Sequence, residues 1–242
     1  CKNRPAFSHP PQAIPHGPCT HLFRTPTMTQ TCPAAAPASF ARVLVWDAPT
    51  RLFHGLLVAC LAGAYATADR DEWQPVHETL GDTTIGLVLF RLFWGFAGTR
   101  YARFATALAG PAAITHHITH LPHGWSRRYA GHSPLGAAFA LLFWLLILAL
   151  GVSGWAAQNT PANVAARLHE GLGHVVLVAM GLYAVALVFS SRRAGENLPL
   201  AMVTGTLWGQ PGEGIDNARP GVAWMLLAAV ASFWLYRWSS PI

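Results

Sequence analysis

Charge is scarce in this sequence of 242 residues, of which only 11% are Asp, Glu, Lys or Arg while 52% are hydrophobic. This balance favours an integral membrane protein over a soluble one. The net charge of +6 is not arranged as a basic stripe interleaved with exposed aromatic residues. Nucleic acid is therefore not an expected partner.

Cysteine is also scarce, and its spacing excludes two kinds of site. The four cysteines are Cys1, Cys19, Cys32 and Cys60. They form no Cys-x-x-Cys-His motif and no disulfide framework, so covalent haem attachment of the c type is not expected. The sequence also has no nucleotide-binding loop and no nucleophile–base motif. We therefore do not expect a stand-alone enzyme.

Long apolar stretches are what the sequence has in abundance. Five of them stand out, at residues 52–68, 79–97, 135–155, 172–189 and 221–236. Each is close to the length that an α-helix needs to cross the hydrocarbon core of a bilayer. Ten tryptophans suit the aromatic belts at the two bilayer interfaces. The sequence therefore predicts an all-α, multi-span membrane protein in contact with lipid.

Arginines indicate the orientation of these spans, because cytoplasmic loops carry an excess of basic residues. With the N-terminus in the cytoplasm, nine arginines lie inside: Arg42, Arg51, Arg100, Arg103, Arg127, Arg128, Arg192, Arg193 and Arg219. Only Arg70, Arg167 and Arg237 lie outside, near the acidic residues Asp69, Asp71 and Glu72. Five spans then place the C-terminus on the outer side.

The first residues differ from the rest in composition, being rich in proline and without periodicity. We expect residues 1–41 to be a leader that is disordered or wrongly assigned to the protein, with the natural start at Met28. Residues 42–205 are the expected transmembrane domain. Residues 206–242 are expected to form a linker and a fifth transmembrane helix.

Three histidines lie near the starts of apolar stretches, at His54, His77 and His169. His77 is followed fourteen residues later by Arg91, and His169 at the same spacing by Tyr183. Fourteen residues are almost four helical turns, so each pair shares a helix face and is separated by roughly 21 Å along the axis. Ionisable side chains inside a membrane span usually serve a function. Haem iron is the strongest candidate for the metal that these imidazoles bind.

Several short motifs resemble those of the bacterial cytochrome b561 and nickel–iron hydrogenase b-type cytochrome family. They run in order through residues 42–205: VWDAPTRLFH at 45–54, HETLG at 77–81, FRLFWG at 90–95, GHSPLG at 131–136, LHE at 168–170, ENL at 196–198 and MVTG at 202–205. None of these motifs is specific alone. Their combination and order make a chance similarity improbable.

The resemblance implies an integral membrane antiparallel four-helix bundle, to which the fifth C-terminal transmembrane helix is an addition. It also implies two b haems, one toward each side of a bacterial inner membrane. The outer haem is expected between His77 and His169, and the inner haem between His54 and position 183. Ligation by two histidines leaves no open iron position, which suits electron transfer.

Position 183 departs from the family pattern, because tyrosine stands where the resemblance implies histidine. Three alternatives follow: Tyr183 ligates the iron itself, His132 replaces the missing ligand, or the inner haem is absent or held by His54 alone. The number of haems is thus left open. Arg91 is expected either to pair with a haem propionate or to extend toward the cytoplasmic headgroups.

The resemblance implies a membrane electron carrier between the quinone pool and a redox partner. That partner is a periplasmic cytochrome c or a hydrogenase-like oxidoreductase, and the chain is then an electron-transfer subunit. No quinone pocket is identifiable from the residues. The alternative is a haem-poor membrane scaffold or assembly subunit that has lost transmembrane electron transfer, an idea prompted by Tyr183.

Overall fold

The computed structural model describes residues 40–104, 134–160 and 163–239. The described chain is mostly helical, as the apolar stretches predicted. Its long helices are α1 (Ala48–Thr67), α2 (Gln74–Ala97), α5 (Pro134–Asn159), α6 (Asn163–Ala194) and α8 (Pro220–Ser239). The short elements are β1 (Ala41–Leu44), the 3-10 turn η1 (Asp71–Trp73), α7 (Leu198–Thr204) and β2 (Thr206–Gly209).

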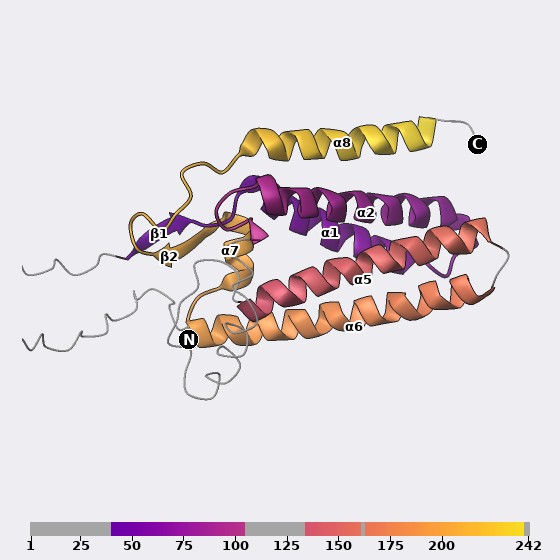
Figure 1. Ribbon diagram of the computed structural model, residues 1–242, viewed down its shortest axis with the longest axis horizontal. Coiled ribbons are helices and arrows are strands. Elements are labelled where there is room, and N and C mark those ends of the chain that lie inside the picture. The colour runs from indigo at the N-terminus through magenta and orange to yellow at the C-terminus, as the bar shows by residue number, and fades with distance from the viewer. Residues whose placement is uncertain (1–39, 105–133, 161–162, 240–242) are drawn as a thin grey trace, which may run out of the picture.

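Two antiparallel helix pairs form the body of the molecule (Figure 1). Helix α1 packs along α2, helix α5 packs along α6, and the two pairs meet through α2 and α5. Helix α8 lies on the outer side of the first pair, against α1 and α2. Its Trp234 indole donates a hydrogen bond to Thr83 of α2, and its Arg237 forms an ion pair with Glu78.

Four helical segments are long and apolar enough to cross a membrane: Asp71–Ala97, Leu135–Asn159, Asn163–Ala194 and Pro220–Ser239. They contain four of the five predicted stretches. Helix α1, which contains most of the stretch 52–68, is not among the four. Only 6% of the most apolar 18-residue segment of α6 is buried inside the protein. Lipid or other non-protein groups must therefore cover most of this segment.

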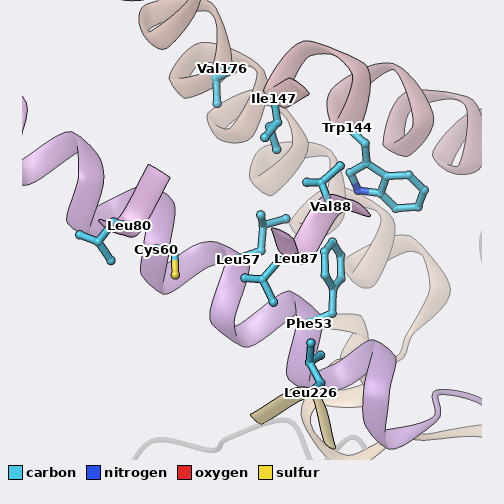
Figure 2. Packing of buried hydrophobic residues seen from close by; sticks show 10 residues of the cluster. All are labelled: Phe53, Leu57, Cys60, Leu80, Leu87, Val88, Trp144, Ile147, Val176 and Leu226. Atoms are coloured by element: carbon cyan, nitrogen blue, oxygen red, sulfur yellow. The ribbon is translucent and has the colours of Figure 1, made fainter. Parts of the chain in front are cut away.

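The main hydrophobic core lies between the two helix pairs (Figure 2). It is built from apolar side chains of all five long helices: Phe53, Leu57, Cys60, Leu80, Leu87, Val88, Trp144, Ile147, Val176 and Leu226. Helices α1 and α2 supply six of these ten, whereas α6 supplies Val176 alone. The first helix pair is therefore the more tightly packed part of the described chain.

A small cap closes one end of the helix pairs, and the all-α expectation did not include it. Strand β1 pairs antiparallel with β2, with Arg42 opposite Trp208. The amides of Val45 and Trp46 both donate to the carbonyl of Gly205, which has a left-handed backbone (φ 82°) after α7. The motifs at 196–198 and 202–205 thus fold back onto the segment that leads into α1.

Candidate cofactor site

His77 and His169 face each other across the two helix pairs. His77 lies in the first turn of α2, and His169 lies in the second turn of α6. Their ring centroids are 6.0 Å apart and their planes are nearly perpendicular, at 86°. Two imidazoles on opposite sides of one metal would have centroids about 6 Å apart, given metal–nitrogen bonds of about 2 Å. The spacing therefore fits a single iron between the two rings.

Backbone carbonyls orient both rings. The Nδ1 atom of His77 lies 2.8 Å from the carbonyl oxygen of Ala64, and Nδ1 of His169 lies 3.0 Å from that of Leu150. A carbonyl oxygen only accepts hydrogen bonds, so each Nδ1 must carry the proton. The Nε2 lone pair is then free to bind a metal, which is the usual arrangement of a ligating histidine.

Residues of helix α5 surround His169. They were not among the residues predicted from the sequence. The Ser153 hydroxyl lies 3.4 Å from Nδ1 of His169. A Cβ atom at Gly154 would lie 2.9 Å from Cε1 of His169 and 3.0 Å from Nδ1. Glycine at this position is therefore what allows the ring to lie against α5. In the sequence, the glycines and the serine of Gly-Val-Ser-Gly at 151–154 were the only indication of this contact.

His54 and Arg91 lie together near the other end of the helix pairs. The Nδ1 atom of His54 lies 2.7 Å from the carbonyl oxygen of Thr50, so this ring is also held through Nδ1, but by a carbonyl of its own helix. Arg91 is only 2% exposed, and its guanidinium lies 4.8 Å from the centre of the Trp144 ring. The side chain is thus buried between helices and does not extend to the exposed surface.

Among the residues that the structure describes, no anion pairs with the buried guanidinium of Arg91. Its Nε and Nη1 atoms are buried and have no hydrogen-bond partner in that part of the chain. An unpaired charge inside a membrane span is costly. A carboxylate brought by a cofactor, such as a haem propionate, would satisfy these donors by charge-assisted hydrogen bonds. Arg91 therefore fits a bound haem at this depth.

Tyr183 does not form a pair with His54 as His169 does with His77. Its ring stacks on Phe139 of α5, with centroids 5.2 Å apart and planes at 7°. Within the described ranges, no hydrogen bond or ring contact links Tyr183 to His54. His132, the other candidate for this position, lies outside the described residues.

Asp47 is a further buried residue that the sequence analysis did not single out. It is 1% exposed, and its carboxylate accepts hydrogen bonds from the Thr50 amide, the Trp94 indole and the Thr99 hydroxyl. The first of these caps the start of α1, the second comes from near the end of α2, and the third comes from a residue two positions past that end. Asp47 thus links the start of α1, which carries His54, to the end of α2, which carries Arg91. The Asp-Ala-Pro-Thr sequence is a typical helix start, and it was the only feature of the sequence that indicated a role for Asp47.

The donor set suits a cofactor better than a bare ion. Among the residues that the structure describes, no group of three or more His, Cys, Asp or Glu side chains converges as a metal site. A structural Zn²⁺ ion usually has four protein ligands. Haem supplies the four equatorial nitrogens itself, so two histidines are sufficient.

Comparison with known proteins gives a family match. The model of the family described as prokaryotic cytochrome b561 matches residues 45–205, more than half of the chain. The match confirms the resemblance seen in the motifs, and it includes α1, α2, α5, α6 and α7 but not α8. No curated protein and no solved structure gives a significant match.

Proposed function

Since the chain belongs to the prokaryotic cytochrome b561 family, we propose that His77 and His169 are the axial ligands of its outer haem b. The family makes the protein a membrane b-type cytochrome that takes part in electron transfer. The single observation that supports the ligand assignment is the pairing of the two anchored rings at 6.0 Å.

Backbone hydrogen bonds hold both proposed ligands in place. Each ring is fixed by a hydrogen bond from Nδ1 to a backbone carbonyl of the neighbouring helix in its pair, Ala64 of α1 for His77 and Leu150 of α5 for His169. Haem bound there would supply a one-electron couple with both axial positions filled, which suits electron transfer and not chemistry at the metal. Arg91 and His54 extend the proposed path toward the cap end, where an inner haem would be held.

The proposed partners are the quinone pool and, on the outer side, a periplasmic cytochrome c or a hydrogenase-like oxidoreductase. We place the protein in the inner membrane with α1 as an additional span, the cap in the cytoplasm and the end of α8 in the periplasm. The distribution of arginines supports this orientation. The exposed carboxylates of Asp69, Asp71 and Glu72 lie near the His77 end and would attract a basic partner.

Reduction by a quinol in membranes tests this function. The haem α-band of the full chain is followed after adding a short-chain quinol, in the parent and in His77→Ala. We expect the parent to be reduced and His77→Ala to lose the signal of the outer haem. His174→Ala is the matched control, because His174 is an exposed histidine of the same helix as His169 and should leave the signal intact.

Two results would contradict the proposal. If His77→Ala were reduced as fully as the parent, His77 would not be a ligand. If the purified parent contained no haem, the alternative of a haem-poor scaffold or assembly subunit would be favoured. The Tyr183–Phe139 stack, which replaces an expected ligand, is the observation behind that alternative.

A further inference from the structure

The two histidine positions of this protein are unequal. At the outer position, two anchored imidazoles face each other across the helix pairs. At the inner position, Nδ1 of His54 is held by the Thr50 carbonyl of its own helix. The described residues bring no second histidine to it, and the residue at the corresponding place on α6 is Tyr183.

The ring of Tyr183 is held against its own helix pair. It lies parallel to Phe139 of α5 at 5.2 Å, and Phe139 in turn stacks on Phe143 at 5.9 Å and 13°. These three rings form a continuous stack between α5 and α6. His54 belongs to the other helix pair, on α1. To act as the partner ligand of His54, Tyr183 would have to give up the stack, and stacked aromatic pairs are favourable contacts.

Arg91 indicates that the inner position still receives an anion. Its buried Nε and Nη1 atoms have no hydrogen-bond partner among the described residues, and its guanidinium lies over Trp144, whose ring contacts Phe53, the neighbour of His54. The nearby carboxylate of Asp47 already accepts three hydrogen bonds, and no ion pair joins it to Arg91 in the described part of the chain. An empty inner position would leave this guanidinium buried and unpaired, at a substantial cost.

From these three observations we infer that His54 is the only described residue that ligates an inner haem, so that the other side of its iron would be open to a small neutral ligand such as carbon monoxide. The inference rests on the proposed function and deepens it. Arg91 holds the anionic edge of the cofactor, and the Tyr183–Phe139 stack keeps the phenol away from the iron. The protein would then combine a closed outer site for electron transfer with an open inner site for ligand binding.

Carbon monoxide difference spectra of the purified, dithionite-reduced full chain test this inference, together with haem content from the pyridine haemochrome. We expect two haems per chain, one of which shifts its Soret band with carbon monoxide. His54→Ala should lose that haem and the carbon monoxide response while keeping the outer haem. Tyr183→His should keep two haems and lose the response, because a second imidazole would fill the open position.

Tyr183→Phe is the matched control, since it keeps the ring and its stack but removes the hydroxyl. It should respond to carbon monoxide like the parent, and a response that appears only in this variant would mean that Tyr183 is a ligand. Two haems without a response in the parent would overturn the inference, as would a single haem without a response. A protein without any haem would instead refute the proposed function itself.

Discussion

At the residue scale, spacing along one helix predicted the membrane depth of a side chain and the helix face on which it lies. It did not predict which groups of a neighbouring helix that side chain contacts. His77 and His169 were identified because each begins a fourteen-residue interval on an apolar helix. The family resemblance, and not this spacing, implied that the two residues pair, and their ring centroids lie 6.0 Å apart. The groups around the two rings belong to neighbouring helices: the carbonyls of Ala64 and Leu150, and Gly154, whose missing side chain leaves room for His169. No pattern within a single helix specifies such contacts, so they were not predicted.

Gly154 offers a sharp test of the His169 side of the site. In Gly154→Ala the new methyl group would meet the imidazole at about 3 Å, so we expect the ring to move and the outer haem to be lost or spectrally altered. Overpacking of this kind costs about 1–3 kcal/mol. The measurement is the reduced-minus-oxidised spectrum per polypeptide.

Gly171→Ala provides the comparison for Gly154→Ala. Gly171 lies on α6, and a Cβ atom there would meet nothing within 4 Å. Both substitutions gain up to about 1 kcal/mol of helix propensity, so the difference between the variants isolates the clash with His169. Equal haem content and identical spectra in the two variants would mean that Gly154 has no role in placing the ring.

At the element scale, the helices were predicted better than their ends. Helix α6 runs from Asn163 to Ala194, whereas the apolar stretch gave 172–189. Hydrophobicity marks the part of a helix that lies in lipid, but the backbone stays helical through polar residues such as Arg167 and Arg192. Strands β1 and β2 were not predicted because each has four residues and its partner is distant in the sequence.

Asp47 shows how one residue joins two elements and leads to a stability prediction. Asp47→Ala removes the cap of α1, a buried hydrogen bond from Trp94 near the end of α2 and a partly buried one from Thr99. At about 1 kcal/mol for each interaction, the loss is roughly 3 kcal/mol. We expect a clearly lower Tm in detergent, measured by circular dichroism.

Asp71→Ala is the control for Asp47→Ala, because Asp71 is an exposed carboxylate in η1 and should leave Tm nearly unchanged. The buried network would lose its proposed importance if the two variants unfolded at the same temperature. Inner haem content should fall with stability in Asp47→Ala, since Asp47 fixes the helices of His54 and Arg91.

At the scale of the whole molecule, the two ends differ in chemistry. Strands β1 and β2, the start of α1 and the end of α6 lie at the cap end, and the starts of α2 and α6 lie at the opposite end (Figure 1). By sequence, the cap end therefore carries Arg42, Arg51 and Arg192, and the opposite end carries His77, His169 and the acidic turn at 69–72. The class of the protein followed from composition and from the motifs, and the family match confirms it. The state of the inner position did not follow, because it depends on where the Tyr183 ring lies relative to helices that are distant in the sequence.

In the proposed function, His77 and His169 together bind one low-spin haem. Electron paramagnetic resonance of the purified, oxidised full chain tests this assignment in the parent and in His77→Ala and His169→Ala. We predict a low-spin ferric signal in the parent that each substitution abolishes, since either change removes one of two axial imidazoles. A low-spin signal that survived both substitutions unchanged would contradict the assignment.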